Sequence, residues 1–420
     1  MNKKNQLSNF SLAMILVVTS LGYFVDAADI VMASVVRTDA IIKLGLANTE
    51  QSIKQIGLEF EKWQSWGILA GCFIWGIFAD KKGRLKILYL SILFYSIATL
   101  VNGYITPAWG NVYEWYSLCR FVSGFGLAAE FGIAITIVSE SFSKEKRGYA
   151  TMIVAIFGLL GCAATCIYQL YAKPAWYMLF RIGGYAGLIL LLLRIGIHES
   201  PVFKHASTQK NIRKGAFTTL FTNFSRFKRL MICVLIGIPT YFVLGLPIKF
   251  AYNFGNAFNI PDVSITITSM VFYFSTIFSD VICNSLSQYF RSRKKMFYFY
   301  NTFNLIAILI FTQYPPKTAF QYQFIYAPLL GMSVGYWALI ATTAAESFGT
   351  NLRATVTTSV PNLIRSSFIP IAFLFSYFET SLGTIGSATV LGVSCSVIAL
   401  IATIFLKETF SKDLKFVEKN

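Results

Sequence analysis

Long apolar runs, separated by short polar links, follow one another along the whole chain. Each run is roughly 17 to 25 residues long, the length at which an α-helix crosses the hydrocarbon core of a bilayer. The pattern predicts twelve membrane-spanning helices, six on each side of a polar stretch from His198 to Arg229. The predicted spans are residues 11–34, 64–80, 86–105, 113–138, 149–172, 176–197, 230–252, 265–289, 296–313, 322–345, 355–377 and 383–406.

The first apolar run has a second interpretation. Lys3 and Lys4, followed by "LAMILVVTSLGYFV", resemble the start of a secretory signal peptide. The run continues through Asp26 and Asp29 into "IVMASVV" without a convincing cleavage site of small residues, and the rest of the chain is equally apolar. We therefore expect a first membrane span and not a cleaved signal.

Composition supports a membrane protein. The chain of 420 residues is 55% hydrophobic and only 13% charged, with a mean hydropathy of +0.59, whereas about a quarter of the residues in soluble domains are charged. The formal net charge of +17 is spread over short clusters between the apolar runs, so we expect no nucleic-acid partner. The seven cysteines lie almost all within apolar runs and form no C-x-x-C motif, which favours buried apolar residues over metal ligands.

The distribution of lysine and arginine predicts the orientation. With the N-terminus in the cytoplasm, most basic clusters, including "DKKGRLK", "KEKR" and "RSRKK", fall on the cytoplasmic side. We expect a multi-pass cell-membrane protein, in the inner membrane if the cell is Gram-negative, with both termini cytoplasmic. The expected units are a six-helix bundle (1–198), a cytoplasmic loop (199–229), a second six-helix bundle (230–406) and a cytoplasmic tail (407–420).

Two links repeat each other half a chain apart. "ESFSKEKR" begins at Glu140 and "ESFGTNLR" at Glu346, and each follows the fourth span of its own half. "NSLSQYFRSRK" at Asn284 is in turn a degraded copy of "GIFADKKGRLK" at Gly76. A duplicated six-plus-six arrangement is typical of transporters that rock two halves around a central site.

These motifs resemble the major facilitator superfamily, in particular its branch of sugar porters and metabolite:proton symporters. "GIFADKKGRLK" is similar to the superfamily signature between spans two and three, and "RFVSGFG" at Arg120 resembles the branch's fourth span. "HESPVF" and "KETF" resemble the sequences that end its sixth and twelfth spans. The resemblance implies an all-α membrane fold of two pseudo-symmetric six-helix bundles.

The resemblance also implies a cytoplasmic gate, with ion pairs of Glu140 with Arg147 and of Glu346 with Arg353 that break when the gate opens. Plain salt bridges at helix ends and positive anchors at the membrane surface are the alternatives. The second half departs from the family pattern, because its links lack a proline and Gln288 stands where an aspartate is expected. The implied gate residues are Gly76, Asp80, Gly83, Arg84, Glu140, Arg147, Glu346 and Arg353.

Ionisable side chains inside the spans are the candidates for proton coupling, because such groups are costly in hydrocarbon. Asp26 and Asp29 share a face of the first span, and Arg120 lies at a similar depth in the fourth. The resemblance implies that one of these aspartates and Arg120 form a switch, while a permanent ion pair is the alternative. Glu130, in the inner half of the fourth span, is the second candidate for proton binding or substrate contact.

Arg365, near the middle of span eleven, is the candidate substrate ligand. Asn362 lies on the same face, and Pro361 and Pro370 flank it. A buried arginine suits a carboxylate or phosphate, although an internal partner such as Asp280 or Glu130 is an equal alternative. Candidate cavity-lining aromatic residues are Tyr23, Trp66, Tyr168, Tyr241 and Trp337.

We therefore expect a monomeric secondary transporter that imports a small polar solute, an organic anion or a sugar-like metabolite, together with protons. No enzyme activity, metal or cofactor is expected, since the chain has no P-loop and its two histidines lie in or beside the polar stretch; a proton gradient would supply the energy. A drug or metabolite exporter is the main alternative, but the fifth span lacks the glycine-proline motif of that branch. A receptor that does not transport is a further alternative.

Overall fold

The computed structural model describes residues 9–82, 84–143, 146–193, 220, 223–349 and 351–410. Before the polar stretch, the described helices form six crossing segments. The second begins at Glu50 and not at residue 64, because its polar first turns continue the helix beyond the apolar part. The segments are α1 (Asn9–Lys43), α2 (Glu50–Lys82), α3 (Arg84–Asn102), α4 with α5 (Val112–Leu127 and Glu130–Ser141), α6 (Arg147–Ala172) and α7 (Trp176–Leu193).

Six more crossing segments follow the polar stretch, and several of them are interrupted. Gly383 adopts a φ of 66° inside α18, where the chain turns from the eleventh crossing into the twelfth. The elements are α10, η3 and α11 (Phe224–Val243, Leu244–Ile248 and Ala251–Ala257), α12 (Ile265–Tyr289), α13 (Arg293–Gln313), α14, η4, α15 and α16 (Ala319–Gln321, Tyr322–Tyr326, Ala327–Ser333 and Trp337–Ser347), α17 (Arg353–Ser366) and α18 (Phe368–Phe405).

The predicted twelve-helix membrane fold is confirmed. Within the described residues, seven segments are long and apolar enough to cross a membrane on those criteria alone, and one of them, Arg353–Phe405, contains two crossings. α3 and α7 contain shorter apolar helices. α2 and α13 have lower mean hydropathy than their neighbours but pack into the same bundle.

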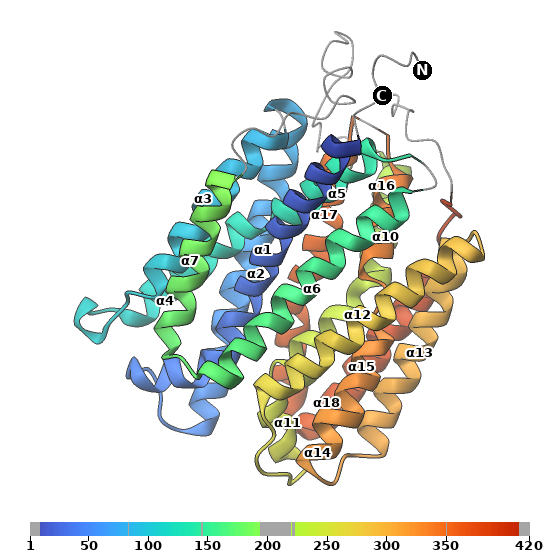
Figure 1. Ribbon diagram of the computed structural model, residues 1–420. Coiled ribbons are helices and arrows are strands. Elements are labelled where there is room, and N and C mark those ends of the chain that lie inside the picture. Colours follow the sequence, from blue (N-terminus) through green and yellow to red (C-terminus); the bar gives the residue numbers. More distant parts are fainter. Residues whose placement is uncertain are drawn as a thin grey trace.

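The helices of the two halves lie side by side. In Figure 1 the blue-to-green helices occupy one side and the yellow-to-red helices the other, with α6 and α12 adjacent where the halves meet. α2 packs along α17 to form the second long contact between the halves. Apolar side chains from both halves belong to one continuous buried cluster.

We name the two ends of the bundle by a buried acid. The Glu346 end contains the links that begin at Glu140 and Glu346, and the sequence predicts it to face the cytoplasm. The Glu61 end is the opposite one. The orientation of these ends in the membrane stays a prediction.

Candidate functional site

Three of the crossing segments near the centre of the bundle are broken near their middles. α4 gives way to α5 at Ala128 and Ala129, α15 is separated from α16 by Val334–Tyr336, and α17 meets α18 at Ser367. Such breaks release backbone carbonyls and amides, which is tolerated at membrane depth where they face protein or a cavity. The breaks therefore mark the level at which a solute can be bound.

A cavity of about 60 Å³ lies at this level. A water molecule takes about 30 Å³ of liquid volume, so the cavity in this conformation has room for one or two waters and not for an organic solute. Its walls come from both halves of the chain. They include Tyr23 and Ala27 of α1, Gly158 and Cys162 of α6, Tyr241 of α10, Tyr273 of α12, Trp337 of α16 and Arg365 of α17.

Arg365 is the cation of the cavity, and its side chain is almost fully buried. Its Nη2 donates to the hydroxyl of Tyr23 over 3.1 Å, and its Nη1 lies 3.4 Å from Oδ1 of Asn362. Its Nε has no hydrogen-bond partner in the part of the chain that the structure describes. Neither Asp280 nor Glu130 forms an ion pair with Arg365 among the described contacts, so its expected internal partners are replaced by neutral groups.

Aromatic rings surround the guanidinium. Tyr23 stacks on Phe131 with centroids 4.4 Å apart, and Phe131 stacks on Trp337 at 5.7 Å. Tyr241 lies 6.2 Å from Trp337, whose indole N–H donates to Tyr23. The cavity thus combines one buried cation with flat aromatic walls.

Of the aromatic residues expected in the cavity, Tyr23, Tyr241 and Trp337 line it. Trp66 instead faces a lateral groove, and Tyr168 is 41% exposed. Phe131 belongs to the stack but was not singled out in the sequence, because its place in the second half of a broken helix has no local signal.

Asn362 does more than line the cavity. Its Nδ2 donates to the carbonyl of Ala128, 2.5 Å away, at the break between α4 and α5, and also to Thr358. It thus joins the second half to a carbonyl that the break leaves free, while its Oδ1 faces Arg365. A direct contact between Asn362 and the substrate stays a prediction.

The acids of α1 have different surroundings. Asp29 accepts hydrogen bonds from the hydroxyls of Thr99, at 2.6 Å, and Ser123, at 2.8 Å. Asp26 lies one turn from Tyr23 and interacts electrostatically with Arg365 across the cavity. Both carboxylates are buried.

The expected ion pair between an α1 aspartate and Arg120 is absent from the described contacts. The terminal nitrogens of Arg120 have no hydrogen-bond partner in the described structure, and its guanidinium lies 5.9 Å from the ring centroid of Phe180. Ser123, one turn along α4, reaches Asp29 instead. Glu130 is the first residue of α5 and is fully buried. The coupling roles of Asp26, Asp29, Arg120 and Glu130 stay predictions.

At the Glu346 end, buried ion pairs join the two halves. Nη1 of Arg353 lies 3.1 Å from Oε1 of Glu140, and Nε of Arg147 lies 3.4 Å from Oε1 of Glu346. Arg293 adds a second cation to Glu346 at 3.3 Å. The sequence suggested pairs within each link, but these described pairs connect each link to the other.

Hydroxyl contacts between the halves continue inward from these pairs. Thr136 contacts Thr357 at 2.5 Å, and Thr151 contacts Thr342 at 2.9 Å. Gly76 allows the backbones of α2 and α17 to approach, since an added Cβ would lie 3.0 Å from Cα of Thr355. The side chains of Asp80 and Arg84, and Gly83 itself, lie outside the described residues.

The Glu61 end has its own buried connection, which the sequence analysis missed. Nζ of Lys249 lies 2.5 Å from Oε2 of Glu61, and Arg37 donates to the carbonyl of Lys249 over 2.7 Å. Further out, Lys54 pairs with Glu379 at 2.5 Å. Both ends of the central cavity are thus closed by contacts between the halves, so this conformation is occluded.

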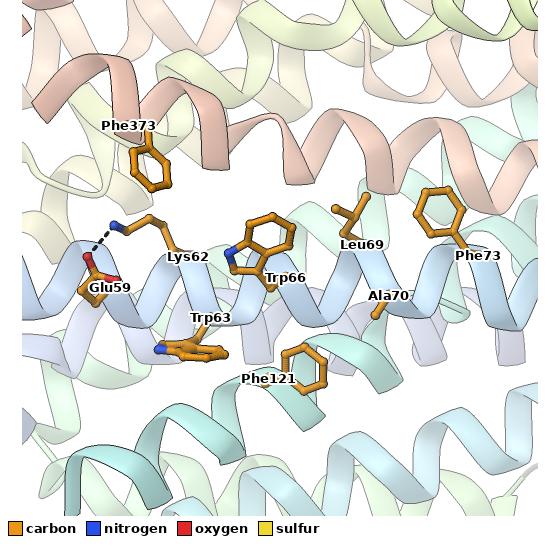
Figure 2. Close-up of a pocket in the computed structure, with 9 residues that line it drawn as sticks. All are labelled: Glu59, Lys62, Trp63, Trp66, Leu69, Ala70, Phe73, Phe121 and Phe373. Atoms are coloured by element: carbon orange, nitrogen blue, oxygen red, sulfur yellow. Dashed lines mark hydrogen bonds and ion pairs between the residues drawn. The ribbon is translucent and has the colours of Figure 1, made fainter. Parts of the chain in front are cut away.

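A larger hollow at the side of the bundle lacks the features of a polar-solute site. It is a lateral groove of about 620 Å³ between α2, α4 and α18. Figure 2 shows Phe373 of α18 opposite Lys62 and Trp66 of α2. Lys62 is paired with Glu59, and apolar or aromatic side chains make up the rest of the lining, so the groove lacks the convergent polar groups of a polar-solute site.

Comparisons with known proteins agree with this geometry. The sequence profile of the Major Facilitator Superfamily matches residues 19–366. A putative niacin/nicotinamide transporter, NiaP, of Bacillus subtilis (strain 168) is 28% identical over 46% of each chain, about half the length of that relative. A putative metabolite transport protein of Haemophilus influenzae is 24% identical over 93% of this chain and 95% of its own. The solved structure of the proton:xylose symporter XylE matches 97% of this chain and 98% of its own, with a TM-score of 0.75 and 16% identity.

Proposed function

Because the chain belongs to the Major Facilitator Superfamily of membrane transporters, we propose that it imports a small planar carboxylate together with a proton by alternating access. Arg365 carries this proposal. It is a buried guanidinium at the level of the helix breaks, one of its nitrogens lacks a partner in the described structure, and aromatic rings flank it. A carboxylate can replace the neutral hydroxyl of Tyr23 as its acceptor.

Charge balance explains why a proton accompanies the solute. In the substrate-free site, the charge of Asp26 acts on Arg365. When an anionic carboxylate binds Arg365, a second anion nearby is unfavourable in a low-dielectric site, so Asp26 takes up a proton. The site then carries the same net charge with and without the solute. In our proposal no cofactor takes part, and the proton gradient drives accumulation.

The ion pairs at the two ends supply the gates. Opening the Glu346 end requires separation of Arg353 from Glu140 and of Arg147 from Glu346. Opening the Glu61 end requires separation of Lys249 from Glu61. We propose that the Glu346 end faces the cytoplasm. Import then ends with release of the solute through the gate at that end.

The relatives supply a first solute to test. The similar proteins include a putative niacin/nicotinamide transporter of Bacillus subtilis and a niacin transporter of Acinetobacter baylyi, and each match covers less than half of this chain. Niacin is a planar ring with one carboxylate, which fits an arginine between aromatic walls. Nicotinate is therefore the first probe, with benzoate, nicotinamide and xylose for comparison.

The experiment is uptake of labelled nicotinate by purified protein in liposomes, with and without an inward proton gradient. We expect a gradient to raise the accumulated nicotinate, and benzoate to compete while nicotinamide and xylose do not. Thermal stability of the purified protein should rise with nicotinate concentration. Equal competition by nicotinamide would contradict a carboxylate site, and xylose-driven stabilisation would favour a sugar.

A further inference from the structure

Asp280 is a buried acid that the mechanism above does not use. It lies on α12, nine residues before Tyr289, and its side chain is completely inaccessible to solvent. Nine residues of α-helix span roughly 13 Å, so the carboxyl group lies well inside the hydrocarbon region. An ionisable group at such a depth indicates a function.

The partners of Asp280 are backbone amides at a helix break. Its Oδ1 accepts from the amide of Ala338 over 3.3 Å, and α16 begins one residue earlier, at Trp337. The first amides of a helix lack partners within the helix and favour an anion. Asp280 therefore caps the α16 half of the broken tenth crossing, and does not belong to the gate at the Glu346 end.

The neighbouring residues of α12 hold the other side of the same break. The hydroxyl of Ser279 donates to the carbonyl of Met332 over 2.7 Å, and Thr276 donates to the carbonyl of Gly331. One face of α12 thus binds carbonyls at the end of α15 and, through Asp280, an amide in the first turn of α16. The position of α16 depends on this face.

Asp280 differs from the buried acids at the two ends of the bundle in lacking a cation. Glu61, Glu140 and Glu346 each have a lysine or arginine nitrogen within 4.0 Å. In the described structure Asp280 has none, and its Oδ2 has no hydrogen-bond partner at all. A carboxylate oxygen that accepts no hydrogen bond and is shielded from water is poorly stabilised as an anion, which favours the protonated carboxyl group.

The groups that face Asp280 do not offset its charge. Cys283 on α12 and Tyr300 on α13 are the titratable side chains that interact with it in the described residues, and both are neutral donors at ordinary pH. From α16 it meets backbone amides, and Asn284 adds a neutral amide from α12. The nearest arginine on this side, Arg293, is bound to Glu346 and Ser287.

We propose that Asp280 is a second proton-binding site, in the second half of the chain, and that its protonation sets the position of Trp337. When ionised, the carboxylate holds the start of α16; when protonated, it loses the charge that attracts these amides. Trp337 is the first residue of α16, and its ring stacks on Phe131 and donates to Tyr23 in the cavity wall. Protonation of Asp280 therefore affects the cavity wall through the backbone of Trp337.

The role of this proton in transport rests on the proposed proton coupling, but proton binding itself does not. It can be measured on the purified protein without any solute, by infrared difference spectroscopy of carboxylic acid C=O bands during a pH titration. We expect the wild type to show a band that shifts in D2O and titrates, and Asp280→Asn to lose that band while Asp26→Asn retains it. An unchanged titration in Asp280→Asn would overturn the proposal.

Two further measurements separate proton binding from a structural role. Asp280→Glu keeps the carboxyl group and should retain a titrating band with a shifted midpoint. Loss of the band in a folded Asp280→Glu protein would contradict the assignment. This variant also provides the test if Asp280→Asn does not fold. In nicotinate counterflow, which needs a gradient of unlabelled nicotinate but no proton gradient, Asp280→Asn should abolish one inflection of the pH profile. An unchanged counterflow profile would show that protonation of Asp280 does not affect the cavity. Failure of the wild type to bind nicotinate would count only against the proposed solute.

Discussion

The hydroxyl of Tyr23 accepts a hydrogen bond from Nη2 of Arg365 over 3.1 Å, although the two residues lie 342 positions apart in the chain. The same hydroxyl accepts from the indole of Trp337. A tyrosine of the first half thus holds two donors of the second half at the centre of the bundle. A solute carboxylate that takes over these donors would release the halves from each other, which links binding to movement.

Replacement of Arg365 by lysine tests the solute contact. Lysine keeps the positive charge but loses the planar pair of donors that matches a carboxylate. Hydrogen bonds to charged groups contribute about 1.5–3 kcal/mol, so we expect the apparent affinity for nicotinate to fall roughly 10- to 100-fold. Arg181→Lys is the matched control, since Arg181 bonds to the carbonyl of Gly103 away from the cavity. Equal affinities in wild type and Arg365→Lys would exclude Arg365 as the ligand.

The pair of Glu140 and Arg353 should be energetically coupled. Both side chains are almost completely buried, and loss of one partner leaves a buried charge, which costs about 3–5 kcal/mol. We expect the single variants Glu140→Gln and Arg353→Gln each to lower the melting temperature. The double variant should lower it by less than the sum of these two decreases. Lys43→Gln, which breaks an exposed pair with Asp39, should change little. Strict additivity of the two gate changes would argue against a direct pair.

Glu61→Gln should loosen the opposite end. Without the carboxylate, Lys249 and Arg37 remain as two buried cations close together, so the conformation that is open at the Glu61 end is favoured. Ala33→Cys places a thiol in the small cavity beside Glu61, and the seven native cysteines are all buried. We expect a membrane-impermeant thiol reagent to label Ala33→Cys faster when Glu61→Gln is also present. Identical labelling rates would contradict a gate at Glu61.

Glu408 predicts a pH dependence of stability at the Glu346 end. Burial by itself raises the pKa of this carboxyl group, but hydrogen bonds from Ser292 and from the amides of Arg293, Phe410 and Thr409 outweigh it and hold the pKa below its usual value. A lowered folded-state pKa stabilises the protein above the unfolded pKa of about 4.3, and this stability is lost as the pH falls through the folded pKa. Between about pH 5 and pH 3, the wild type should therefore lose more thermal stability than Glu408→Gln. A parallel decline of both proteins would contradict this role.

The repeated links and apolar runs were sufficient to predict the fold, because span length and duplication are properties of the sequence itself. Arg365, Tyr241 and Trp337 were predicted to lie at the central site and do line the cavity. A charged or large aromatic residue within a predicted span can be recognised from the sequence alone. The pairing of Glu61 with Lys249 was missed because the two residues lie 188 positions apart and neither has a motif. The cap that Asp280 places on α16 was missed for a similar reason, since it depends on where a neighbouring helix breaks.

The choice between Asp26, Asp29 and Arg120 illustrates the same limit. A similar depth was predicted for them because spans one and four run in opposite directions, but depth does not determine which side chains meet across a bundle. Thr99 and Ser123 satisfy Asp29, whereas Asp26 is the acid that acts on Arg365. Asp26 is therefore the coupling acid in our proposal, and its role stays a prediction.

Proton movement during nicotinate uptake tests the central claim most directly. In lightly buffered suspensions of proteoliposomes, wild-type protein should make the outer medium more alkaline when nicotinate is added. Asp26→Asn should still exchange labelled nicotinate across the membrane, but without this alkalinisation and without accumulation driven by a pH gradient, while Asp39→Asn, an exposed acid on the same helix, should behave as wild type. Full proton-driven accumulation by Asp26→Asn would contradict the account.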